Sequence, residues 1–154
     1  MRLSDYKGSN EALLKRVLSS KGLYQINTVV DTNNYVSIES LRSVGSYDLS
    51  QLAGDITFRK GLPNEKYTGT TNRSLFLKNL PVLCDENGPF GSPTSDSNRA
   101  LINETTTDVL TVIYSFDGPS FLEEQLLKVK DLLKTYAAGE TFSMFIVKDK
   151  LKLD

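Results

Sequence analysis

The side chains best suited to chemistry lie around a turn-rich stretch in the second half of the sequence. Asp85 and Glu86 precede this Gly- and Pro-rich stretch, and Asp96 follows it. The chain contains no histidine, so carboxylates are the only conventional general bases available. A carboxylate held beside a hydroxyl could position or deprotonate a water molecule. The alternative is that Asp96 accepts hydrogen bonds from backbone N–H groups of its own loop, as Asp in loops commonly does.

Two hydroxyls, an amide and a guanidinium accompany Asp96 in residues 95–99. Arg99 could bind a carboxylate or a phosphate through two parallel hydrogen bonds. It could equally fix the loop by pairing with Asp96, and the sequence leaves both readings open. Ser97 is a candidate ligand contact in the same run. Thr106, in a run of three threonines before an apolar segment, could line a pocket or simply favour a strand.

Several chemistries are excluded by composition. Without histidine and with Cys84 as the single cysteine, neither a zinc site nor a Ser-His or Cys-His nucleophile pair is expected. Cys84 lies in an apolar segment and is expected to be an inert core thiol. No Gly-rich phosphate-binding motif is present, so we expect no cofactor and no metal. A net charge of −1 limits any nucleic-acid contact to a local one or to a chain end.

Length and composition predict one domain over residues 1–154. Hydrophobic residues make up 39% and charged residues 24% of the 154, as in ordinary globular proteins. No apolar stretch approaches the roughly 20 residues that span a bilayer, and the first residues are polar. A single cysteine fits a reducing compartment. We therefore predict a cytoplasmic protein without a membrane contact.

Three helices are predicted from apolar periodicity and end signals. The first covers 9–20, with Ser9 as N-cap and Gly22 as the stop. The second covers 29–41, and its buried face would carry Asn34, as a ligand contact or as a hydrogen-bonded structural amide, together with Val30, Ile38 and Leu41. The third runs from about 119 to 138, ends at Gly139 and would bury Leu122, Leu126, Val129, Leu133 and Tyr136.

Strands are predicted at 55–60, 75–78, 80–85, 108–116 and 141–147, with 108–116 as a central strand buried on both faces. Residues 61–74 and 85–97 are predicted to be loops because turn-forming residues dominate them. Helices and strands do not alternate regularly, which indicates an α+β fold. Gly45 precedes Tyr47, a side chain that could stack on a base or fill the core.

The ordered set of motifs resembles a known family. These motifs are residues 26–36 (INTVVDTNNYV), 45–49 (GSYDL), 54–59 (GDITFR), 85–93 (DENGPFGSP), 95–99 (SDSNR) and 106–110 (TTDVL). Their order and spacing resemble the editing domain of phenylalanyl-tRNA synthetase β chains over roughly residues 9–138. The Gly-Pro-Phe-Gly-Ser-Pro loop is most similar to the stand-alone relatives of that domain. The resemblance implies an α+β fold with a mixed, partly barrel-like β-sheet core packed by helices.

The resemblance also implies a function. In the synthetases this domain hydrolyses tyrosine wrongly attached to the phenylalanine tRNA. Carried over, it implies Asp96 and Thr106 as catalytic residues. It implies as substrate contacts Asn34, Gly45, Tyr47, Gly88, Phe90, Gly91, Ser97 and Arg99, with N–H groups of the Gly88–Gly91 loop as oxyanion donors.

This sequence departs from the synthetase pattern at two points. Gly45 or Ser46 stands where the synthetases have a histidine, and residues 96–99 replace a Gly-rich element with a pocket glutamate. The stand-alone relatives usually carry a further N-terminal helical segment, and the resemblance leaves open whether one is missing here. The expected partner is tRNA or aminoacyl-tRNA, and not DNA. Three hypotheses follow: an aminoacyl-tRNA deacylase, a binding module for RNA, amino acid or another small ligand without turnover, and a structural or interaction protein.

Overall fold

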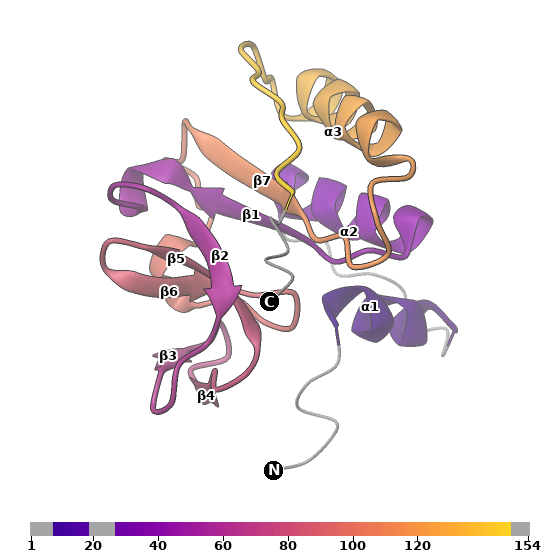
Figure 1. The fold of residues 1–154 in the computed structure, drawn as a ribbon. Coiled ribbons are helices and arrows are strands. Elements are labelled where there is room, and N and C mark those ends of the chain that lie inside the picture. The colour runs from indigo at the N-terminus through magenta and orange to yellow at the C-terminus, as the bar shows by residue number, and fades with distance from the viewer. Residues whose placement is uncertain (1–7, 19–26, 149–154) are drawn as a thin grey trace.

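The computed structural model describes residues 8–18 and 27–148, which fold into three helices and seven strands in the order α1, α2, β1–β7, α3 (Figure 1). The predicted stop at Gly22 and the tail from residue 149 lie outside this range. The helices are α1 (Ser9–Leu18), α2 (Thr28–Ser40) and α3 (Leu122–Tyr136). The strands are β1 (Val44–Asp48), β2 (Thr57–Lys60), β3 (Lys66–Thr68), β4 (Ser74–Phe76), β5 (Pro81–Asp85), β6 (Gly88–Gly91) and β7 (Val109–Ile113).

The strands form three small antiparallel sheets. Strand β1 pairs with β7, β5 lies between β2 and β6, and β3 pairs with β4. The predicted α+β class is confirmed. The expected mixed, partly barrel-like sheet is wrong, since all pairings in the described residues are antiparallel and the sheets do not close into a barrel.

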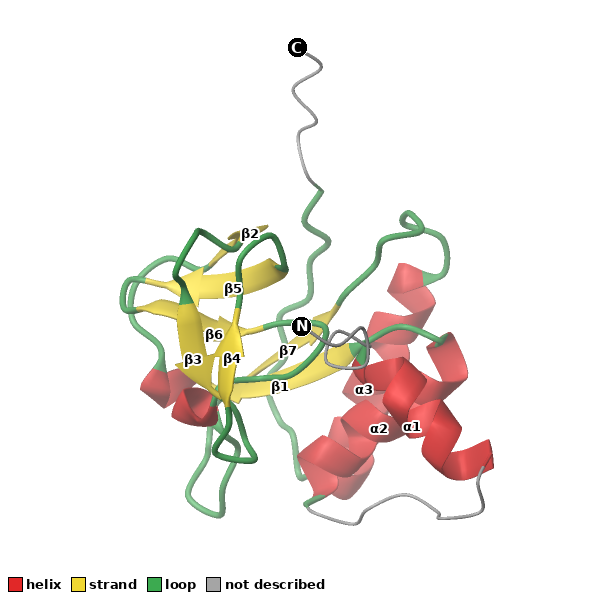
Figure 2. Ribbon diagram, turned by 90° about the horizontal axis from the view of Figure 1, so that it is seen from below, coloured by secondary structure: helices red, strands yellow, loops and turns green. Residues whose placement is uncertain are grey.

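The β1–β7 ribbon lies between a helical side and a strand side of the molecule (Figure 2). Helix α2 packs on β1 and contacts both α1 and α3. Because successive side chains of a strand point to opposite faces, each face of the ribbon buries a different cluster. Val44 of β1 packs with Val36 of α2 and Val129 of α3, whereas Tyr47 faces the other strands and packs with Leu83.

Helix α2 agrees with the prediction in its limits but not in its buried face. Asn27 is the N-cap, and its side chain accepts a hydrogen bond of 2.9 Å from the Val30 N–H. The buried face consists of Thr32, Asn33, Val36 and Ser37. Leu41 is instead the C-cap, with φ 56° and 63% exposure. The predicted face was wrong because α2 presents a polar side chain to β1, where Asn33 Oδ1 accepts a hydrogen bond of 2.8 Å from Ser46 Oγ.

Two strands form inside segments that were predicted to be loops. Strand β3 lies within 61–74, and β6 lies within 85–97. The turn between β5 and β6 requires Gly88, whose φ of +108° favours glycine. Pro89 is tolerated in β6 because β6 is an edge strand, where a missing N–H need not break a ladder. In β6, residues that usually form turns therefore form a short edge strand.

The C-terminal third departs most from the prediction. Strand β7 is half-buried and pairs only with β1 among the described residues, so it is not a central strand. Residues 141–147 form no strand there and are mostly exposed. In α3, Leu122 and Val129 are buried but Tyr136 is 68% exposed. After α3 the left-handed position belongs to Ala138 (φ 55°) rather than Gly139.

No helix within residues 8–18 and 27–148 is long and apolar enough to cross a membrane.

Candidate functional site

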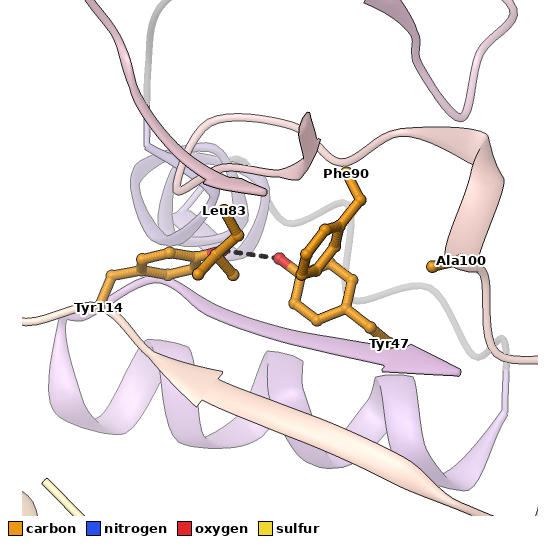
Figure 3. Close-up of a cluster of buried hydrophobic side chains, with 5 residues drawn as sticks. All are labelled: Tyr47, Leu83, Phe90, Ala100 and Tyr114. Atoms are coloured by element: carbon orange, nitrogen blue, oxygen red, sulfur yellow. Dashed lines mark hydrogen bonds between the residues drawn. The ribbon is translucent and has the colours of Figure 1, made fainter. Parts of the chain in front are cut away.

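The buried hydroxyl of Tyr47 is the centre of the candidate site. Tyr47 is 1% exposed, and its hydroxyl oxygen lies 2.7 Å from Asp96 Oδ1 and 2.7 Å from the Tyr114 hydroxyl. Figure 3 shows the two phenols pointing toward each other across the core. Tyr47 comes from β1, Tyr114 follows β7, and Asp96 comes from the segment after β6. Three distant parts of the chain therefore meet at one hydrogen-bonded cluster.

Two glycines make room for the Tyr47 hydroxyl. A Cβ atom at Gly45 would lie 2.5 Å from the Tyr47 hydroxyl oxygen, and one at Gly91 would lie 2.4 Å from it. Phe90 packs edge-on against Tyr47, with ring centroids 4.9 Å apart, and is itself 0% exposed. The structure thus gathers three predicted contact residues, Gly45, Phe90 and Gly91, around Tyr47. Phe90 enters this group as a core ring.

Burial sets the protonation of this cluster. It is the largest cause that raises the pKa of Tyr47 and of Tyr114 well above the usual value, so both phenols stay protonated at neutral pH. Burial also raises the pKa of Asp96 to about 6, against the opposing hydrogen bonds from Tyr47 and from the Ser92 N–H. When Asp96 is ionised, Tyr47 donates its one proton to Asp96. The Tyr47 oxygen then accepts from Tyr114.

Only one oxygen of Asp96 is used by the described residues. Both hydrogen bonds to the carboxylate, from Tyr47 at 2.7 Å and from the Ser92 N–H at 3.2 Å, end on Oδ1. Ser92 Oγ in turn accepts from the N–H groups of Thr94 and Ser95, which holds the segment in a compact turn. The cluster therefore fixes the carboxylate by one oxygen, and the described residues give no hydrogen bond to Oδ2.

Arg99 belongs to a second, separate cluster. Its guanidinium donates to both oxygens of Asp85 at 2.9 and 2.8 Å and to the Gly88 carbonyl at 3.0 Å. Asp85 also accepts from the N–H groups of Ala53 and Asn87. The Arg99 hydrogen bonds are the largest cause that lowers the pKa of Asp85 to about 2. The loop-fixing alternative for Arg99 holds, but its partner is Asp85 rather than Asp96.

The remaining candidates are placed elsewhere. Ser97 caps a short 3₁₀ turn, where its Oγ accepts from the Arg99 N–H at 3.1 Å. Thr106 Oγ1 donates to Asp48 Oδ2 at 2.9 Å, and no hydrogen bond among the described residues joins Thr106 to Asp96. Asn34 is half-buried, while its neighbour Asn33 accepts from Ser46 Oγ at 2.8 Å on the buried face of α2.

Sequence reasoning missed Tyr114, Ser92 and Tyr67. Tyr114 lies in the apolar run 108–116. A buried tyrosine requires a hydrogen-bond partner for its hydroxyl, and this requirement could have identified Tyr114 from sequence. The hydroxyl of Tyr67 reaches Ser92 Oγ at 3.1 Å and also bonds the Ser95 carbonyl. Within the described ranges, no three His, Cys, Asp or Glu side chains are grouped so that they could hold a metal ion.

Comparison with known proteins identifies the domain family. A family model of the B3/4 domain matches residues 2–126. The chain belongs to the B3/4 domain family. It is 36% identical over 110 residues to the phenylalanine–tRNA ligase β subunit of Streptomyces avermitilis, which is 68% of this chain and 13% of that subunit. It is 32% identical over 104 residues to the β subunit of Fusobacterium nucleatum, which is 66% of this chain and 13% of that subunit.

The resemblance found in the motifs is therefore confirmed, at the level of this domain. The B3/4 domain described here corresponds to about an eighth of the length of these curated relatives. The activity and substrates of the whole ligase are not transferred with that match.

Gly91→Ala in this B3/4 domain is expected to lower the free energy of unfolding by roughly 1–3 kcal/mol, because the new methyl group overpacks a filled core. The double variant Gly91→Ala/Tyr47→Phe lacks the hydroxyl that the methyl group meets first, so it should recover part of this loss. Urea denaturation of both single variants and the double variant measures this coupling. Strictly additive losses would show that the hydroxyl and Gly91 do not compete for the same space.

Proposed function

We propose that this B3/4 domain binds the amino-acid-bearing 3′ end of a tRNA and hydrolyses the ester that joins the two when the amino acid is wrong. The observation that carries the proposal is the state of Asp96. Burial raises the pKa of its carboxyl group to about 6, and the carboxylate is fixed through Oδ1, so that Oδ2 would receive the reacting water. A base with a pKa near the working pH is well matched to proton transfer.

The proposed reaction needs one proton acceptor and one water. Asp96 Oδ2 accepts a proton from the water as the water oxygen attacks the ester carbonyl carbon. The tetrahedral intermediate then breaks its bond to the ribose oxygen, and that oxygen takes the proton back from Asp96. The products are a free amino acid and a tRNA with a free terminal hydroxyl. An aminoacyl ester is already activated, so orientation of the water supplies much of the rate.

The Tyr47–Tyr114 pair supports this role of Asp96 without reacting itself. Both phenols are held protonated by burial, so Tyr47 acts as a fixed hydrogen-bond donor that orients the carboxylate. The predicted oxyanion donors are not part of the proposal. Residues Gly88–Gly91 form strand β6, and Gly88, Pro89 and Gly91 stand opposite residues of β5, so they are not the open loop that was expected.

A second candidate function, binding without turnover, is favoured by the position of Thr106. Thr106, the other proposed catalytic residue, is bonded to Asp48 instead of Asp96. In this alternative the cluster would recognise a ligand by hydrogen bonding and release no product.

Release of amino acid from mischarged tRNA is the deciding measurement. The protein is incubated with phenylalanine tRNA carrying tyrosine, beside a panel of other mischarged tRNAs. We expect release above the spontaneous rate for at least one of them, because Asp96 accepts the proton of the attacking water. No release across the panel by folded protein contradicts hydrolysis. Thermal stabilisation by one of these RNAs without product would then support the binding function.

A further inference from the structure

An exposed aromatic strip begins at the candidate site and runs to the surface. We define it as Tyr114, Phe58 and Phe116. The ring centroids of Tyr114 and Phe58 are 5.7 Å apart, and those of Phe58 and Phe116 are 6.5 Å apart. Exposure rises along the strip, from 5% at Tyr114 to 51% at Phe58 and 69% at Phe116. Two large aromatic side chains therefore present ring surface to solvent beside a buried polar cluster.

The strip is continuous with the site because of how the strands pair. Phe58 in β2 stands opposite Leu83 in β5, and Leu83 packs in the same core cluster as Tyr47 and Tyr114. Tyr114 therefore has two contacts: its ring meets Phe58, and its hydroxyl meets Tyr47, which holds Asp96. The Tyr114 side chain thus contacts both Phe58 and the Tyr47 hydroxyl.

A cation lies next to the strip on the same strand. Lys60 follows Phe58 by two residues in β2, so both side chains point to the same face, and both are exposed. The described residues give Lys60 no ion pair. On the opposite face of β2, Arg59 is already paired with Glu65 at 2.6 Å. Lys60 is thus the basic residue of β2 that can meet a phosphate without breaking an existing pair.

We propose that the strip stacks the terminal base of the RNA, with Lys60 at the adjoining phosphate. This inference rests on the proposed function, because it places the amino acid ester at Asp96 and the base of the same terminal nucleoside on Phe58 and Phe116. Aromatic side chains bind unpaired bases through their faces with little regard for sequence. The two Phe rings are tilted by 46°, so neither covers the face of the other. The flat face of a base and the charge of its phosphate match this surface better than an aliphatic segment does.

Binding of an uncharged RNA hairpin with a tRNA acceptor-stem sequence and a single-stranded 3′ end tests this inference. Isothermal titration compares the protein with the double variant Phe58→Leu/Phe116→Leu, which keeps apolar side chains but lacks the rings. We expect affinity to fall roughly 5- to 100-fold. Phe76→Leu is the matched control, since Phe76 is 64% exposed in β4 outside the strip, and it should bind like the parent protein. Lys60→Gln should lower the salt dependence of binding by about one phosphate contact.

The same hairpin with an abasic terminal nucleotide separates stacking from other contacts. Loss of the base should weaken binding to the parent protein about as much as loss of the two rings, and should add little in the double variant. Equal affinity of the parent protein for intact and abasic hairpins would overturn the inference, and so would no RNA binding at all. A double variant that binds RNA normally but loses a protein partner would assign the strip to that protein instead.

The two proposals can fail separately because this binding assay needs no turnover. Ring-dependent binding without release of amino acid would retain the strip and reject hydrolysis. If the Phe58→Leu/Phe116→Leu variant releases amino acid with the same kcat and KM as the parent protein, hydrolysis is retained and the role of the strip is rejected. Both side chains are more than half exposed, so the double variant should keep the Tm of the parent protein, which thermal denaturation measures.

Discussion

Asp96→Asn is expected to lower amino acid release roughly 10²- to 10⁴-fold, the contribution of a positioned general base. The side-chain amide has nearly the same shape as the carboxylate. Its oxygen can still accept the hydrogen bonds that Tyr47 and the Ser92 N–H now give to Oδ1. The variant therefore loses the proton acceptor while it keeps the cluster. Single-turnover kinetics with the responsive mischarged tRNA measures the effect, and Asp55→Asn, on an exposed carboxylate, is the matched control.

The pH dependence gives the same prediction an independent signature. In the proposed reaction the ionised carboxylate is the base, so the parent rate should rise with pH through about 6 and reach a plateau above it. The residual rate of Asp96→Asn should lack this step. A parent rate without an inflection near pH 6, or an unchanged rate in the variant, would remove Asp96 from the mechanism.

Stability should change in the opposite direction to activity. The pKa of Asp96 is about 6 in the fold against the usual value of 3.8 for an aspartate, so the unfolded chain gives up its proton first as the pH rises. The parent protein should thus lose roughly 1–3 kcal/mol of stability between about pH 4 and pH 6, and no more from this group above that. Asp96→Asn removes this loss and should be more stable than the parent at pH 7. Loss of both activity and stability would instead indicate a purely structural Asp96.

The positions of several elements were predictable from sequence, but their burial was not. The limits of α2 and the positions of β2, β4 and β5 agree with the prediction within two or three residues. The buried face of α2 is a different one, however, and β2 is mostly exposed. The short strands β3 and β6 were not predictable. Gly88, Pro89 and Gly91 of β6 are turn formers, and β3 has only three residues, Lys66–Thr68, inside a turn-rich segment. Both strands depend on a partner strand that the neighbouring segments bring alongside.

The site was predictable in part, for a related reason. Tyr47, Asp96 and the two glycines came from motifs of the resemblance, and the structure brings them together. Tyr114 lies 67 residues from Tyr47 in sequence, and its role depends on the register of β1 against β7. The partner of Arg99 depends likewise on the β5–β6 turn. Local pattern names the residue types of a site, while long-range pairing decides which of them meet.

Arg99→Met is expected to be the most destabilising of the substitutions considered, at roughly 2–4 kcal/mol, because it leaves a charge buried without its partner. The side chain of Asp85 is 0% exposed, and that of Arg99 is 29% exposed. Methionine keeps an apolar stem over Phe90 but cannot donate to Asp85 or to the Gly88 carbonyl. Two N–H groups from the backbone would remain as the partners of the carboxylate. Urea denaturation at pH 7 measures the loss.

The control is a second bidentate pair in a different environment. Arg59 donates to both oxygens of Glu65 at 2.9 and 2.6 Å, but its side chain is 34% exposed and that of Glu65 is 19% exposed. Solvent screens such a pair, so Arg59→Met should cost at most about 1 kcal/mol. Equal losses in the two variants would show that burial of Asp85 does not set the energy of its pair with Arg99.

The acid limb of the stability curve separates Asp85 from Asp96. The pKa of Asp85 is about 2 against the usual value of 3.8 for an aspartate, so its stabilisation is fully present above about pH 4 and is lost as the pH falls through 2. This corresponds to about 2 kcal/mol in the parent protein, and Arg99→Met should lose most of it. An unchanged acid limb in Arg99→Met would show that the backbone donors alone hold the pKa down. Asp85, which pairs with Arg99, is thus fixed in its charged form and shapes the β5–β6 hairpin. Asp96, which is held by Tyr47 and the Ser92 N–H instead, can take up a proton near neutral pH, as the proposed hydrolysis requires.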